Sequence, residues 1–273
     1  MLGKLIKYEF KATARRMLPL IVAVLVLSLL SSFSVMRLDS ATDYGVIQVF
    51  FILIIVAFVV GIIALGVMSI VVFIDRFYKN LLGSEGYLMF TLPVSVDALV
   101  WSKLIVSFIW FVLTSLAVLA AMLILGFVTS ALTITGEEIR MFMDGVKLLF
   151  AQIGAGNIIG YVLEFVVLMF VSSLATCLHF YLAMAIGQAF ANRKMLWSVV
   201  FYFVLSFALS MLSAAAVALG DKIGILDAFV DLAKTATQSA HLMAVSSIIV
   251  CTVVSAILYF PTTALLKKKL NLA

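Results

Sequence analysis

The stretch VIQVFFILIIVAFVVGIIALGVMSIVVFI (46–74) is followed directly by DRFYKNLLGSEGYLMFTLPVSVDALVWSKL (75–104). The first stretch is long enough to cross a bilayer as a helix, because a hydrocarbon core of about 30 Å requires about 20 apolar residues. The second stretch is charged, rich in turn residues and carries aromatic side chains. We expect a membrane protein to present such a segment to a partner on one side of the bilayer.

The rest of the chain predicts the same fold class. Hydrophobic residues make up 66% of the 273 residues and charged residues only 11%, whereas soluble domains are about 45–50% apolar. The apolar runs are continuous and lack the alternation of a barrel strand, so only helices can span the membrane here. The sequence therefore predicts an all-α, polytopic membrane protein with six transmembrane helices, near 18–36, 46–74, 99–125, 158–186, 196–219 and 244–266.

The basic residues predict the orientation. If the N-terminus is cytoplasmic, 13 of the 18 Lys and Arg lie on the cytoplasmic side, and the five outside are Arg37, Arg140, Lys147, Lys222 and Lys234. Positive residues favour the cytoplasmic side, so we expect both termini there. The net charge of +5 then follows from membrane topology, and no nucleic-acid partner is expected.

The N-terminal residues 1–17 have helical periodicity. Apolar and small side chains recur every three or four residues, whereas lysines and an arginine occupy another face. This pattern predicts an in-plane helix in the headgroup layer, followed by a turn at Pro19. A simple basic flank that orients the first span is the alternative.

The polar loop 76–96 predicts a short cytoplasmic helix. Gly83 permits a chain reversal, Ser84 can cap the helix, and Pro93 stops it. A helix of about two turns is not stable alone in water, so it requires a packing neighbour. A partner protein is one such neighbour. The alternative neighbour is the lipid interface, where tryptophans such as Trp101 are commonly found.

At these residues the chain resembles a known family. RFYKNLLGSEGYLMFTLPVS (76–95) resembles the intracellular loop between the second and third helices of bacterial ABC transporter permeases of the type-2 exporter class, and MLGKLIKYEFKATAR (1–15) and KKKLNL (267–272) resemble the ends of these permeases. The resemblance implies a single transmembrane permease domain (1–273) in the bacterial plasma membrane, with an elbow helix at 1–17. It also implies a coupling helix that inserts into a separate ATPase subunit, formed by Ser84, Glu85, Gly86, Tyr87, Leu88, Met89 and Phe90.

The same resemblance implies partners and cargo. Two permease subunits, identical or different, pair around the transport path, and ATP and Mg belong to the ATPase subunit, so this chain binds no cofactor. The chain contains no Gly-x-x-x-x-Gly-Lys-Ser/Thr loop, so we expect it not to be an enzyme. The cargo of such an exporter would be an antimicrobial peptide, a drug or a lipid-like amphiphile. An ATP-independent secondary transporter or a membrane assembly factor is the alternative.

Few residues within the spans can carry chemistry. Glu164 is the single carboxylate inside a predicted span, and it either lines the path or a subunit seam, or reaches the outer headgroups. His179 is expected to be a buried hydrogen-bonding residue, and Cys177 and Cys251 read as small apolar residues and not as metal ligands. The external loops 130–156 and 220–243 are predicted to hold interfacial or re-entrant helices, including a broken helix at 225–241.

Overall fold

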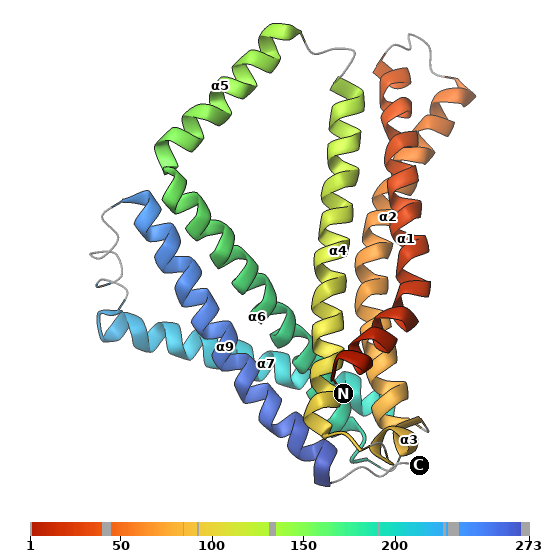
Figure 1. Cartoon of the computed structure of the whole chain (residues 1–273), viewed down its shortest axis with the longest axis vertical. Helices are drawn as coiled ribbons and strands as arrows, with labels where there is room; N and C mark the ends of the chain where they lie inside the picture. The colour runs from red at the N-terminus through yellow and green to blue at the C-terminus, as the bar shows by residue number, and fades with distance from the viewer. Residues whose placement is uncertain are drawn as a thin grey trace. The chain divides into compact units, whose positions relative to one another are not determined.

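The computed structural model describes residues 2–39, 45–83, 85–91, 93–130, 135–190, 192–225, 228 and 235–268. Over these residues the chain is all-helical, which confirms the predicted class. Six helices are long and apolar enough to cross a membrane, as predicted: α1 (Leu2–Asp39), α2 (Val46–Phe77), α4 (Val96–Ser130), α6 (Ala155–Gly187), α7 (Lys194–Lys222) and α9 (Ala236–Lys268). A π-helix η1 (Tyr78–Leu82), the short helix α3 (Glu85–Thr91) and the helix α5 (Gly136–Ile153) lie between them (Figure 1).

The helices form two compact units. Unit 1 comprises Met1–Asp75 and Ile105–Val146, and unit 2 comprises Arg76–Leu104 and Lys147–Ala273. The polar segment between α2 and α4 therefore belongs to the unit that contains α6, α7 and α9. Because the helices divide into two compact units, the single permease domain stays a prediction.

Unit 1 is centred on Trp110 of α4. The Trp110 side chain is fully buried, its Nε1 donates to Thr13 Oγ1 at 2.7 Å, and its ring stacks on Phe10 with centroids 4.9 Å apart. Met17 and Val72 belong to the same buried cluster. At one edge of this unit Arg16 Nη1 donates to Asp75 Oδ2 at 2.7 Å, which links α1 to the end of α2.

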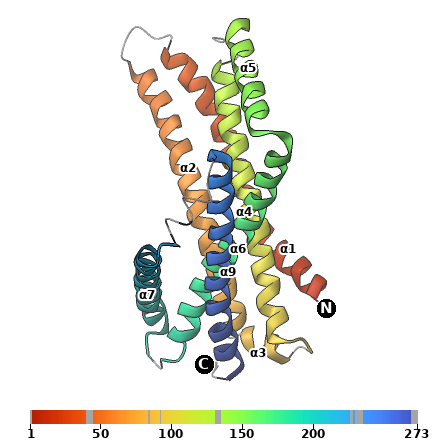
Figure 2. The same ribbon diagram turned by 90° about the vertical axis from the view of Figure 1, so that its left-hand side faces the viewer.

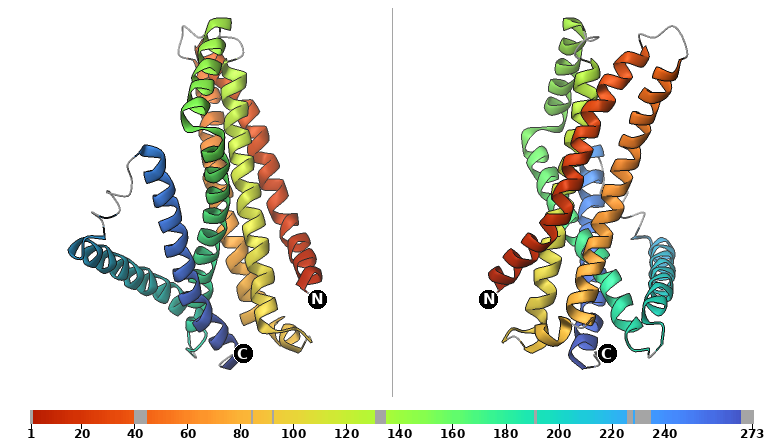
Figure 3. Two further views of the ribbon diagram at one scale, coloured as in Figure 1. Left: turned by 60° about the vertical axis from the view of Figure 1, so that its left-hand side comes forward. Right: turned by 90° about the vertical axis from the view of Figure 1, so that its right-hand side faces the viewer.

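The N-terminal part of α1 differs from the expected elbow. Leu2–Asp39 form one helix with Pro19 inside it, so the turn expected at Pro19 is wrong. A proline within a helix removes one backbone hydrogen bond and bends the helix without always ending it, and Figures 1 and 3 show α1 bent toward its N-terminus. The predicted apolar face is present, because Ile6, Phe10, Ala14 and Met17 pack into the core of unit 1. The in-plane orientation of residues 1–17 stays a prediction.

In unit 2, α6 and α9 run side by side in the same direction (Figures 1 and 2). Tyr161 OH donates to Thr237 O at 3.1 Å near their N-terminal ends, and Ser255 Oγ donates to Val171 O at 3.3 Å further along. Helix α7 runs the opposite way and contacts α6 along its first half, where His179 Nε2 lies 3.1 Å from Ser206 Oγ and the Phe180 ring stacks on Tyr202. There, a Cβ added at Gly187 would lie 2.2 Å from Ser198 Oγ. Parallel α6 and α9 with an antiparallel α7 are the directions expected of three consecutive spans.

The loops at the other helix ends agree partly with the predictions. Helix α5 forms as expected, and its apolar residues Ile139, Phe142 and Met143 are exposed. A left-handed Gly154, with φ of 79°, separates α5 from α6. In the loop 220–243, residues 226–227 and 229–234 lie outside the described residues. His241, placed by the prediction in a separate broken helix, is part of the long helix α9.

Candidate functional site

The segment between α2 and α4 begins with an unexpected π-helix. In η1 the side chains of Asn80, Leu81 and Leu82 are buried. Phe77, directly before η1, stacks on Tyr181 of α6 with ring centroids 3.7 Å apart, and Gln188 Nε2, just beyond α6, donates to Leu82 O at 3.4 Å. π-Helical turns are rare and occur frequently at functional sites. The C-terminal end of α6 therefore supports the entry into α3.

Asn80 connects the end of α2 to the start of α3. With its amide oriented to satisfy both neighbours, Asn80 donates to Glu85 Oε2 at 2.9 Å and accepts from Arg76 Nη2 at 3.2 Å. The turn between η1 and α3 requires Gly83, because an added Cβ would lie 3.0 Å from Lys79 O. Asn80 belongs to the π-helix η1, and its amide lies between the two charged side chains.

A seven-residue helix, α3, occupies the predicted position, and Pro93 follows it. Glu85 is its first residue, Gly86 is buried, and Met89 and Phe90 are half-buried. Leu88 is exposed, at 74%. Ser84 and the Tyr87 side chain lie outside the described residues. The structure thus contains the short helix, and its coupling role stays a prediction.

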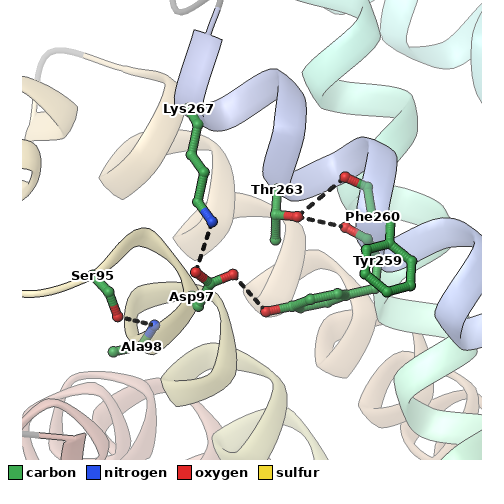
Figure 4. Close-up of polar contacts among 7 residues, drawn as sticks. All are labelled: Ser95, Asp97, Ala98, Tyr259, Phe260, Thr263 and Lys267. Carbon is green, nitrogen blue, oxygen red and sulfur yellow. Dashed lines mark hydrogen bonds and ion pairs between the residues drawn. The ribbon is translucent and has the colours of Figure 1, made fainter.

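The exit from α3 is fastened by Asp97, which the sequence analysis did not single out. Ser95 caps α4 by accepting from Ala98 N at 3.2 Å. Two residues later, the Asp97 carboxylate accepts from Tyr259 OH and from Lys267 Nζ, each at 2.8 Å (Figure 4). Both donors belong to α9 and lie two helical turns apart. Only tertiary structure could reveal this contact, since the partners are 162 and 170 residues from Asp97.

Glu164 is paired across two helices. Its Oε1 lies 2.8 Å from Nδ1 of His241 in α9, and the His241 ring stacks on Tyr161 with centroids 4.2 Å apart. The second oxygen, Oε2, is buried without a hydrogen-bond partner among the described residues. Gly160 allows the close approach, because a Cβ there would lie 3.0 Å from His241 Cε1. The signal in the sequence was that Glu164 and His241 fall near the same ends of the fourth and sixth predicted spans.

His179 is hydrogen-bonded, as expected, but it is half-buried and not buried. Its Nε2 lies 3.2 Å from Tyr202 O and 3.1 Å from Ser206 Oγ. The ring lines a pocket of about 220 Å³ between α6, α7 and α9, whose other walls are mostly apolar. Ser206 also donates to Tyr202 O at 2.8 Å, so its hydroxyl has a structural partner. The arrangement holds α7 against α6.

In the part of the chain that the structure describes, no group of three or more His, Cys, Asp or Glu is placed to hold a metal ion. The contacts instead form two separate sites within unit 2. One is the α3 segment, fastened at its entry by Asn80 and Gln188 and at its exit by Asp97. The other is the Glu164–His241 pair. Comparison of the chain with protein-family models, with curated proteins and with solved structures gives no match.

Proposed function

We propose that this chain is the permease subunit of an ATP-driven exporter of the type-2 ABC class. In this proposal α3 is a coupling helix that docks on a separate ATPase subunit, which supplies ATP and Mg. Two permease subunits pair in the bacterial plasma membrane, with all termini cytoplasmic. The cargo is an antimicrobial peptide, a drug or a lipid-like amphiphile.

The observation that carries the proposal is the placement of α3. A seven-residue helix between two apolar helices is too short to be stable by itself, yet it is fastened at both ends and exposes Leu88. Four basic residues, Arg76, Lys79, Lys103 and Lys267, lie in or next to the contacts that fasten this segment in unit 2. By the distribution of positive charge this end is cytoplasmic, where an ATPase is available. Burial of the exposed Leu88 side chain by a partner would remove apolar surface from water and so stabilise the complex.

The test is capture of an ATPase from native membranes through an affinity tag. We expect the wild-type chain to copurify with a protein that hydrolyses ATP and whose sequence contains a Gly-x-x-x-x-Gly-Lys-Ser/Thr loop. Leu88→Asp should lose that protein, because a charge at the anchor opposes burial. Met141→Asp makes the same change at an exposed residue of α5 and should retain it. Absence of such a protein, or its retention by Leu88→Asp, would reject the proposal.

The Glu164–His241 pair favours a second candidate. Secondary transporters commonly use ionisable groups within the membrane, and here two such groups meet within a pair of candidate spans. The second candidate is therefore an ATP-independent transporter driven by an ion gradient. Efflux of a fluorescent amphiphilic peptide distinguishes the two candidates. Efflux by an ATP-driven exporter stops when the captured ATPase is inactivated, whereas efflux by a gradient-driven transporter stops when the ion gradient is dissipated.

A further inference from the structure

The α3 segment is mounted on helices that are distant from it in sequence. It joins α2 to α4, but residues Arg76–Leu104 form one compact unit with α6, α7 and α9. The main parts of α2 and α4 belong to the other unit. The movement of the segment is therefore limited by its tertiary contacts as well as by its two covalent connections.

Asp97 supplies the contact at the exit of α3. Its Oδ1 accepts from Tyr259 OH and its Oδ2 accepts from Lys267 Nζ, so each carboxylate oxygen holds one donor from α9 (Figure 4). Only five residues separate Asp97 from the last residue of α3. The part of α9 between the two donors is itself well packed, since Thr262 and Leu266 are buried. The carboxylate thus joins the end of α3 to a firmly held turn of α9.

The two bonds differ in strength. The Lys267 and Asp97 side chains are 49% and 39% exposed, so water screens the ion pair and weakens it. The Tyr259 bond is partly buried, and the tyrosine ring lies beside Trp101 with centroids 6.0 Å apart. A hydrogen bond from a rigid ring to a charged oxygen loses little freedom when it forms. Tyr259 is therefore the stronger of the two attachments.

We propose that Asp97 is a positioning residue that fixes the exit of α3 to the C-terminal end of α9. A displacement of α3 is then carried to α9 through Tyr259. The positional part stands on the contacts alone, whereas the displacement by an ATPase rests on the proposed function.

The positional part can be tested without any ATPase. In the full chain in lipid nanodiscs, with Cys177→Ala and Cys251→Ala, a spin label is attached at Leu88→Cys, and its mobility is measured by electron paramagnetic resonance. Tyr259→Phe keeps the ring and removes the bond, and should raise the mobile fraction at least about ten-fold, the factor expected for one hydrogen bond to a charged group. Lys267→Gln should raise it less.

Two controls separate positioning from general loosening. Tyr8→Phe removes a hydroxyl from a tyrosine that is 70% exposed and should leave the label at position 88 unchanged. A label at Phe127→Cys, on the exposed surface of α4 in unit 1, should not respond to Tyr259→Phe. Asp97→Ala removes both bonds and should raise the mobile fraction of the label at position 88 at least as much as Tyr259→Phe does. If Asp97→Ala does not fold, the result for Tyr259→Phe alone tests the inference.

Each outcome supports or overturns the inference. The inference is overturned if Tyr259→Phe leaves the mobility of the label at position 88 unchanged. It is also overturned if the mobility of the label at position 127 changes equally. Where an ATPase is captured, the Tyr259→Phe variant should still bind it but should transport less cargo per ATP hydrolysed. An unchanged ratio of transport to ATP hydrolysis would overturn the inference that a displacement of α3 is carried to α9. A mobility effect at 88 without any captured ATPase supports the positional inference and rejects the proposed function, so the two failures are distinguishable.

Discussion

At the scale of single residues, the side chains with the clearest chemistry are those paired across helices. Glu164 was expected to line a path or a subunit seam, or to reach the outer headgroups; the structure pairs it with His241, and its role stays a prediction. An isolated carboxylate at membrane depth is costly, and a histidine that donates to it reduces that cost. The chain has two histidines, and both bind across helices.

The first prediction concerns this pair. Glu164→Gln retains size and an acceptor for His241, so we expect near-normal expression and thermal stability. Glu164→Leu leaves the half-buried His241 donor without its acceptor, at a cost of about 1 kcal/mol, and should lower the midpoint of thermal unfolding. Unfolding in nanodiscs and efflux of a fluorescent amphiphilic peptide should be measured for both variants.

The control is the double variant Glu164→Leu with His241→Phe, which removes both polar partners and should recover part of the lost stability. If Glu164→Gln also loses transport while it keeps its stability, the carboxylate has a role in the path. Equal stability of Glu164→Leu and wild type would contradict the importance of the pair.

At the scale of single elements, the apolar face predicted for the N-terminal third of α1 is present, but it packs against protein and not only against lipid. The periodicity of residues 1–17 predicted a helix with one apolar face, which was assigned to lipid. In the structure much of that face packs against α4 through Phe10, Thr13 and Met17. A periodic apolar face does not specify what covers it, because lipid and protein are equally apolar.

The second prediction concerns Trp110, which anchors this element. Trp110→Ala should destabilise unit 1 by about 3 kcal/mol or more, because a fully buried ring and its hydrogen bond to Thr13 are both lost. Limited trypsin digestion should then cleave more rapidly at Lys4, Lys7 and Lys11. Trp110→Phe keeps the stacking and should have a smaller effect.

The matched control is Trp197→Ala in α7, where the tryptophan is 40% exposed and stacks on Phe190. Its removal should leave cleavage of the N-terminal lysines unchanged. Equal protection of these lysines in wild type and Trp110→Ala would show that Trp110 does not hold α1.

At the scale of the whole molecule, the even number of candidate spans among the described residues predicts that both ends lie on one side of a membrane. The charge distribution predicts which side that is. In unit 2, α6 and α9 are parallel, and the contacts of Gly187 with Ser198 and of His179 with Ser206 show that α7 runs back along α6, as expected of three consecutive crossings.

The third prediction is the orientation. In a chain without its native cysteines, Leu88→Cys should react with a membrane-impermeant maleimide only after cells are permeabilised, because 13 of 18 basic residues favour that side as cytoplasmic. Glu138→Cys on α5 should react in intact cells. External labelling at position 88 would reverse the topology and would remove the basis for docking a cytoplasmic ATPase.

The sequence alone determined the number of long helices, the approximate ends of all but the first, and the short helix before Pro93. These features depend on local quantities: the length of an apolar run against the thickness of a bilayer, helical periodicity, and the restricted backbone of proline. The tertiary structure decided which residues meet, such as Asp97 with Tyr259, Glu164 with His241 and Trp110 with Thr13. The physical reason is that a spanning helix is apolar on all sides, so its sequence does not encode how it is rotated or at what depth it meets its neighbour. Those two variables are set only when the helices pack, and they decide which polar side chains come within hydrogen-bonding distance.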